Sequence, residues 1–598
     1  MYLRNNALKY NIIMTFSNAF DSAFNEMTYA NAYVRGENGA LAHATAASTF
    51  QDFYGKLSEL FLVSRRETYS RISSILNDLF TIIRTTTDVD LKHEYFGDVI
   101  KMSLFIREPR SGKGERDIFY NIVYYMWNNY PKVCNFMVNN LQHYGYWGDF
   151  NRLYNFTENN KFRELLVKVF GDQLVKDSIA DSDKMSLAGK WAPRENSKYP
   201  FFALALTNYI CLEKYPKVTQ VATKRKLYRK LVSGLNKELE TVQVSMCDNK
   251  WSNINFSNVP SVAITNLTKA FQNEKQSPFP KSKRFGKFKM MHGKRCDIEN
   301  EHYNDREKCR ENFLSCIKDG KIKAAVTDLS KIIQNYLDGS EIDVAWEAQW
   351  EKRVVEIRTM IKENNLDPCI FPMIDLSSSM NGDPIIHAIT MGLFTSMILD
   401  NDEDVEPPFA NRFMSFASQP ALAKLPRKGT LHDKMQIIKQ WCDGQYWGGN
   451  TNIMSAIRLL LKIAVSNNLS KDEMPKVLAI FSDMQFDQGD RSWNLTSYGQ
   501  IKSEFEKHGY DVPHVLFWNL RSQTQGYQVP ANATNTSMVS GYSTRMLDLF
   551  ISGTLNELQE CDDCTKNSSS TLTLVDKALK HEMFEKINDS LKNLVLHL

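Results

Sequence analysis

The chain lacks long apolar runs, and it carries little net charge for its length. It has no apolar stretch of about 18 residues, the minimum for a membrane-spanning helix, so we expect no transmembrane helix and no membrane partner. The formal charge is only +4 over 598 residues. This excludes a protein that binds nucleic acid through its overall charge and leaves only local basic patches for that role.

Cysteine is also sparse. The ten cysteines are scattered, most of them singly inside apolar stretches, a usage typical of reduced thiols in a cytosolic compartment. Cys561 and Cys564 have CxxC spacing, but no second pair or matching histidines lie near them in the sequence. A structural zinc site is therefore not favoured. The first residues lack the apolar core of a signal peptide, so we expect a soluble, intracellular protein.

The composition is that of a globular protein, with 43% apolar and 24% charged residues. The length predicts several domains rather than one core. We expect a multidomain chain with a loosely ordered lead-in over residues 1–45, an all-α helical array over 46–365 and an α/β domain over 366–598.

The middle region shows helical periodicity. Phe53, Leu57, Leu60 and Phe61 share one helical face, and further amphipathic segments follow at 117–129, 161–170, 201–212 and 226–240. Successive amphipathic helices joined by short turns predict a HEAT-like solenoid or ring. An irregular helical bundle remains the alternative, because the sequence shows no fixed repeat period.

From about residue 366 the pattern changes to short apolar strands that alternate with helices. The strand-like segments are 369–376, 412–418, 476–483, 514–520 and 537–543. This alternation predicts a doubly wound, mostly parallel sheet. Ligands of such sheets bind at the carboxyl ends of the strands.

Oxygen-bearing side chains follow two of these strands. Asp375, Ser377 and Ser379 form a D-x-S-x-S turn after the first strand, and Asp483 ends the third. Thr451 precedes a predicted helix. Mg²⁺ prefers such oxygen ligands, although the two serines alone are also typical of a helix cap.

These five residues resemble the metal-ion-dependent adhesion site of von Willebrand factor A domains. The resemblance implies a bound Mg²⁺ (or Mn²⁺ or Ca²⁺) with one coordination position open for a partner's carboxylate, and therefore binding rather than catalysis. A metal-dependent phosphoester hydrolase is a further alternative, but such enzymes generally need a second carboxylate where position 377 supplies a serine.

A basic, glycine-bearing turn opens a helix in the first half of the chain, with Arg107, Arg110, Lys113 and Arg116 close together. It is not a nucleotide-binding P-loop, because position 107 lacks the required glycine and no strand precedes it. Backbone amides and arginines suit a phosphate or carboxylate. Internal ion pairing is an equally good interpretation.

A second basic segment spans residues 269–295, where nine Lys or Arg accompany one acidic residue and several phenylalanines. Basic groups with interleaved aromatics favour single-stranded RNA, while a solvated loop with packed phenylalanines is the alternative. An adjoining helix adds five basic residues from Lys224 to Lys230. The candidate RNA contacts in the segment are Lys281, Lys283, Arg284, Lys287, Lys289, Lys294 and Arg295.

Together with the segments 143–154, 190–195 and 258–263, the basic turn resembles an uncharacterised family of plant and large-DNA-virus proteins with a C-terminal von Willebrand A-like domain. That family in turn resembles the Ro autoantigen, or TROVE-module, proteins. The resemblance implies a helical ring that binds small or misfolded RNAs by their single-stranded ends.

The sequence therefore predicts a non-enzymatic, ribonucleoprotein-like RNA-binding protein with a metal-dependent ligand-binding domain, in the cytoplasm or, for a viral protein, the host cytoplasm or virion. The alternative is a metal-dependent protein-interaction scaffold, associated with virus particles and without RNA.

Overall fold

The computed structural model describes residues 33–49, 51–274, 300–324, 327–366, 369–400, 406, 409–416, 419–442, 451–487, 496–521, 526–555, 557–558 and 570–595. Contacts divide the chain into two compact units. Unit 1 combines Met1–Ile122 with Glu356–Leu598, and unit 2 is Val123–Val355. These bounds differ from the expected domain ranges, because the first helices pack with the C-terminal part of the chain.

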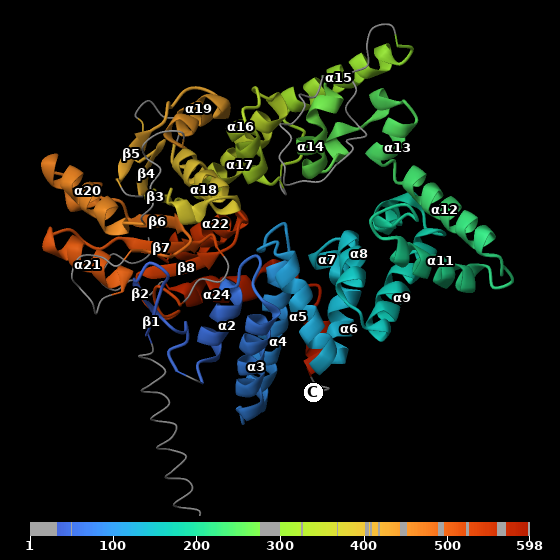
Figure 1. Ribbon diagram of the computed structural model, residues 1–598, viewed down its shortest axis with the longest axis horizontal. Helices are drawn as coiled ribbons and strands as arrows, with labels where there is room; N and C mark the ends of the chain where they lie inside the picture. Colours follow the sequence, from blue (N-terminus) through green and yellow to red (C-terminus); the bar gives the residue numbers. More distant parts are fainter. Residues whose placement is uncertain are drawn as a thin grey trace, which may run out of the picture. The chain divides into compact units, whose positions relative to one another are not determined.

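The centre of unit 1 is a six-stranded, mostly parallel sheet, which confirms the predicted α/β architecture of the C-terminal region. The strand order is β5-β4-β3-β6-β7-β8, and only β4 and β5 pair antiparallel (Figure 1). The strands are β3 Ile370–Asp375, β4 Arg412–Phe416, β5 Ala421–Lys424, β6 Val477–Ser482, β7 His514–Asn519 and β8 Thr536–Ser540. The short edge strand β5 was not predicted from the sequence.

Helices cover both faces of this sheet. On one face, Phe371 and Met373 of β3 pack in a core with α20 (Ile453–Ser466) and α21 (Ser497–Lys507). On the other face α18 (Asp383–Ile398) crosses β3 (Figure 1). α18 approaches β3 closely at Gly392, where an added Cβ would lie 2.2 Å from Cδ1 of Ile374. Only glycine allows this approach without displacing the strand side chain.

Part of the predicted lead-in is an ordered hairpin. β1 (Tyr33–Arg35) pairs antiparallel with β2 (Leu41–His43), and His43 exchanges two backbone hydrogen bonds of 2.7 Å with Tyr527. The expectation of loose order is therefore wrong for residues 33–45, because these backbone contacts fix the hairpin to unit 1. The rest of the lead-in lies outside the described residues.

The first helices of unit 1 pack beside the sheet. They are α2 Phe53–Leu62, α3 Tyr69–Thr85 and α4 Val89–Arg107, and they are joined there by the C-terminal helices α24 Thr571–Leu579 and α25 Asn588–Val595. This unit also contains α19 Leu431–Cys442 and α22 Arg545–Phe550. α2 and α24 both contact β8, so these helices cover the β8 end of the sheet.

Unit 2 is helical, as predicted for the middle of the chain. Its helices are the end of α5 (Arg116–Asn129), α6 Pro131–Asn139, α7 Leu141–Tyr144, α8 Trp147–Phe156, α9 Asn160–Asp177, α10 Ala188–Trp191, α11 Pro200–Lys214, α12 Val221–Glu238, α13 Val242–Cys247, α14 Ser261–Phe271, α15 Tyr303–Lys318, α16 Leu329–Leu337 and most of α17 Val344–Glu363. The rings of Phe256, Phe271 and Phe313 pack against one another in tilted and edge-to-face arrangements within one core, with centroids 4.8–5.3 Å apart.

None of the helices in the described part of the chain is both long and apolar enough to cross a membrane.

Replacing Gly392 by alanine tests the close approach of α18 to β3. The new methyl group has to displace Ile374, and we expect this overpacking to destabilise the protein by roughly 1–3 kcal/mol, measured by thermal or urea unfolding. Ile374→Val in the same chain should restore part of the loss, because it removes the nearest atom. Gly234→Ala in α12 is the matched control: no heavy atom lies within 4 Å of its Cβ position, so equal destabilisation by both variants would contradict the packing argument.

Candidate functional site

Two carboxylates lie at the carboxyl ends of neighbouring strands. Asp375 is the last residue of β3, and Asp483 directly follows β6. β3 and β6 run parallel, with Ile374 opposite Phe481. The strand order reverses between these two strands, since β4 and β5 lie on one side and β7 and β8 on the other. Ligands of open α/β sheets bind at this kind of switch point.

Both carboxylates are fully buried. Asp375 accepts a hydrogen bond from the Ser377 backbone amide (2.9 Å) on Oδ1, and the Ser482 hydroxyl donates to its Oδ2. Asp483 accepts from the Gln485 amide (3.1 Å) on Oδ1 and from Arg521 Nη1 (3.3 Å) on Oδ2. Each loop after its strand therefore folds back onto its own aspartate.

Burial, reinforced by the negative charge of Asp483, raises the pKa of Asp375 to about 7. The hydrogen bonds from Ser482 and Ser377 oppose this shift without cancelling it. The pair is thus close enough for mutual repulsion, and a cation between the two loops would relieve the repulsion.

The three predicted hydroxyl ligands lie on the same loops or next to them. Ser377 Oγ is 2.9 Å from Ser379 Oγ. The carbonyl of Thr451 accepts from the amide of Asp487 (3.0 Å), which fixes Thr451 to the loop after β6. The side chain of Asn452 caps α20 at the Ser455 amide (3.0 Å), so Thr451 immediately precedes the helix, as the sequence predicted.

The hydroxyl of Thr451 is buried, and no described residue forms a hydrogen bond with its Oγ1. A buried polar group without a partner costs free energy. Coordination of a cation by this oxygen would remove that cost. Within the described ranges, no group of three or more His, Cys, Asp or Glu side chains is placed to hold a metal ion. The set Asp375, Ser377, Ser379, Thr451 and Asp483 offers oxygen atoms only, which suits hard cations such as Mg²⁺.

Sequence reasoning missed the groups around these aspartates. Arg521, two residues past β7, lies between Asp483 (3.3 Å) and Glu37 (3.4 Å). Glu37 belongs to the N-terminal hairpin, where its amide donates to Gln485 Oε1 (2.6 Å). No sequence pattern indicates that residues 448 positions apart in the chain meet, so only the folded structure reveals this contact.

The basic turn is partly buried rather than a surface patch, which corrects the interpretation of Arg107 and Lys113 as RNA contacts. Arg107 is 1% exposed. Lys113 is 3% exposed, and its ammonium donates to Ser540 Oγ (2.8 Å) and to the carbonyls of Phe61 and Val63. These bonds fix the turn to the end of β8. They favour the alternative in which the basic residues of the turn pair within the protein rather than with RNA.

The other two basic residues of the turn reach the surface. The Arg110 side chain is 47% exposed and pairs with Glu108 (2.8 Å), and Arg116 is exposed. Gly112 is required here, because an added Cβ would lie 2.2 Å from the Phe105 carbonyl oxygen.

The second basic segment lies almost wholly outside the described residues. This holds for all of its candidate contacts, Lys281, Lys283, Arg284, Lys287, Lys289, Lys294 and Arg295, and also for Cys561 and Cys564. Phe271, at the start of the segment, is buried in the core of unit 2 and is therefore not a surface for base stacking. The adjoining helix α12 does present basic side chains to solvent, among them Lys226, Arg229 and Lys230.

Two family models match the chain, and both describe domains of unknown function. DUF7788 matches residues 369–590, and DUF2828 matches residues 151–282. An uncharacterized protein of Acanthamoeba polyphaga mimivirus is 26% identical over 533 residues, which cover 86% of this chain and 83% of the viral protein. The predicted similarity to an uncharacterised family with large-DNA-virus members is confirmed. The descriptions of the two family models and of the viral protein mention neither von Willebrand A domains nor Ro proteins.

The buried carboxylate pair predicts that Asp375→Asn stabilises the cation-free protein. The raised pKa means that Asp375 binds a proton in the folded state between pH 3.8 and 7, where the unfolded chain does not. Its contribution to stability is therefore complete below pH 3.8 and is lost as the pH rises through 7. In chelator above pH 7, we expect Asp375→Asn to raise the free energy of unfolding by on the order of 1–4 kcal/mol.

Urea unfolding of wild type and variant across this pH range measures the difference. A gain that is independent of pH, or a loss above pH 7, would contradict the repulsion between the two aspartates.

Proposed function

We propose that the chain is a non-enzymatic binding protein whose α/β domain holds a divalent cation, Mg²⁺ (or Mn²⁺ or Ca²⁺), and uses it to bind an acidic protein partner. Asp375, Ser377, Ser379, Thr451 and Asp483 would hold the cation. When bound, the cation supplies positive charge and a coordination position for a carboxylate of the partner.

The observation that carries this proposal is the combination of two buried carboxylates with an unpartnered buried hydroxyl at one switch point. Each of these features is unfavourable in isolation, and one hard cation would satisfy all of them. The protein's own groups have clear roles: Ser482 and the loop amides orient the aspartates, and Arg521 lies against Asp483. Phosphoester hydrolases of this kind generally need a second carboxylate where position 377 supplies a serine, so the hydrolase interpretation has less support.

Two finer expectations belong to the same proposal. The strand order and the five site residues support a von Willebrand A-like domain, and the succession of helices in unit 2 supports a HEAT-like array of the TROVE type. The similarity to a mimivirus protein supports action in a host cytoplasm or in a virion.

Thr451→Val tests the cation site with little disturbance of the fold. Removing a hydroxyl that has no partner should leave the melting temperature in chelator unchanged or higher, while the rise in melting temperature on adding Mg²⁺ or Mn²⁺ should shrink. Thr395→Val is the matched control, because Thr395 is also buried with no hydrogen-bond partner for its hydroxyl among the described residues, but it lies within α18. If both variants respond to cations as wild type does, Thr451 is not a ligand.

Partner binding is tested by affinity capture with and without chelator, comparing wild type with Asp375→Ala. The proposal predicts a partner rich in Asp and Glu that is lost under both perturbations. A set of partners that neither perturbation alters would contradict it.

RNA binding is a second candidate function, and the exposed basic face of α12 favours it. Lys226, Arg229 and Lys230 point to solvent on one helix, and Arg225 beside them pairs only loosely with Glu195 (3.7 Å). Such a face attracts phosphates and releases their counterions.

Charge reversal of Lys226, Arg229 and Lys230 to Glu should weaken the binding of single-stranded RNA. Its salt dependence should also flatten, by about 0.7 in log–log slope per lost phosphate contact. Reversal of Lys283, Arg284, Lys287 and Lys289 provides the same measurement on the second basic segment. If neither variant changes the affinity for single-stranded RNA or the salt dependence of binding, RNA binding by these two basic surfaces is contradicted.

A further inference from the structure

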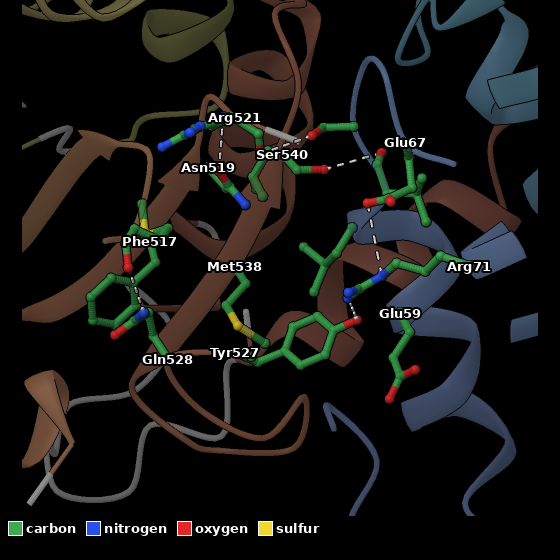
Figure 2. Close-up of a pocket in the computed structure, with 16 residues that line it drawn as sticks. Glu59, Glu67, Arg71, Phe517, Asn519, Arg521, Tyr527, Gln528, Met538 and Ser540 are labelled. Atoms are coloured by element: carbon green, nitrogen blue, oxygen red, sulfur yellow. Dashed lines mark hydrogen bonds and ion pairs between the residues drawn. The ribbon is translucent and has the colours of Figure 1, made fainter. Parts of the chain in front are cut away.

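A pocket lies within unit 1 beside the loop that follows β6. It is lined by residues from the end of α2 and the loop to α3, from β7 and β8, and from the segment 526–528 (Figure 2). It encloses about 520 Å³, a volume that includes space open to solvent. Met484 and Arg521 belong to its lining and also adjoin Asp483, so the pocket begins where the cation site ends.

The floor of the pocket is apolar. Figure 2 shows the side chains of Phe517, Met538 and Tyr527 in a row, and the apolar lining also includes Leu62 and Met484. Methionine side chains adapt to differently shaped apolar groups, and aromatic rings offer a large apolar surface.

Most charged groups in the wall are already paired with neighbours. Arg71 donates to the Tyr527 hydroxyl (3.1 Å) and lies 3.8 Å from Glu67 (Figure 2). Glu59 accepts from Lys56 (3.2 Å) and from the Ala46 amide (3.0 Å). A ligand that enters the pocket therefore meets few polar groups in need of a partner, and an apolar group fits it best.

Arg521 differs from these groups because it faces the cation site. Its side chain is 38% exposed, and its guanidinium lies 3.3 Å from Asp483 and 3.4 Å from Glu37. A carboxylate that approaches the cation from this side would also meet a guanidinium, a favourable partner for carboxylates. Gln528 also lines the pocket, and its buried side-chain oxygen accepts no hydrogen bond from any described residue; a peptide amide is a donor for such an oxygen.

We propose that the pocket receives a bulky apolar side chain that neighbours, in the partner's sequence, the acidic residue bound by the cation and Arg521. The ligand is thus an acidic–apolar peptide segment, recognised by charge at one end and by burial at the other. This inference rests on the proposed function, because it needs the cation to hold the carboxylate.

The test uses two synthetic peptides and the full-length protein. Acetyl-Gly-Asp-Leu-Gly-amide carries both recognition elements, and acetyl-Gly-Asp-Gly-Gly-amide lacks the apolar one. Calorimetric titrations are made in Mg²⁺ and in chelator, after a separate titration has measured Mg²⁺ binding alone. We expect the leucine peptide to bind about tenfold more tightly in Mg²⁺, as burial of one leucine side chain allows.

Leu62→Trp fills the pocket from the end of α2, where Leu62 is only partly buried. It should abolish the advantage of the leucine peptide and leave Mg²⁺ binding intact. Leu91→Trp is the matched control, since Leu91 is an exposed leucine at the start of α4 that does not line the pocket, and it should retain the advantage.

The outcomes separate the two claims. Equal, Mg²⁺-dependent binding of both peptides, or an advantage that survives Leu62→Trp, would overturn the pocket inference while the proposed function stands. The absence of peptide binding to a protein that binds Mg²⁺ would overturn the inference as well. A protein that does not bind Mg²⁺ would overturn the proposed function and the inference with it.

Discussion

Asp375 and Asp483 end neighbouring parallel strands, and neither carboxylate has any exposed surface. Burial raises the pKa of Asp375, and the negative charge of Asp483 raises it further, because two buried carboxylates repel each other. The rest of the site follows from this constraint. Ser482 and the loop amides donate to the aspartates, Arg521 adds one positive charge, and the unpartnered hydroxyl of Thr451 contributes a further oxygen. We propose that a divalent cation completes this arrangement.

The same edge of the sheet also organises distant parts of unit 1. The N-terminal hairpin reaches it through Glu37 and Gln485, and the buried ammonium of Lys113 joins the basic turn to the end of β8 at Ser540. Residues far apart in the sequence therefore lie together at this edge, beside both the aspartates and the adjacent pocket. This explains why the first helices group with the α/β domain rather than with the helices of unit 2.

Local patterns of the sequence predicted many of the helices and five of the six strands of the sheet. They also placed Asp375 and Asp483 at the carboxyl ends of strands, because strand ends in a parallel sheet have a fixed location. Local patterns could not predict features that depend on packing between distant parts of the chain. β5 is an edge strand of only four residues, too short to show a strand periodicity in the sequence. Arg107 and Lys113 have surface-type side chains but are buried by the fold. Arg521 has no motif around it, and the pocket is formed by segments more than 400 residues apart.

The most direct test of the central claim is anomalous diffraction from crystals grown with Mn²⁺. The account predicts one strong peak within coordination distance of the side-chain oxygens of Asp375, Ser377, Ser379 and Thr451, close to Asp483, and its loss in crystals of Thr451→Val or Asp375→Ala. A peak elsewhere in the chain, or none at this edge of the sheet in well-ordered crystals, would contradict the claim that these five residues form a cation site.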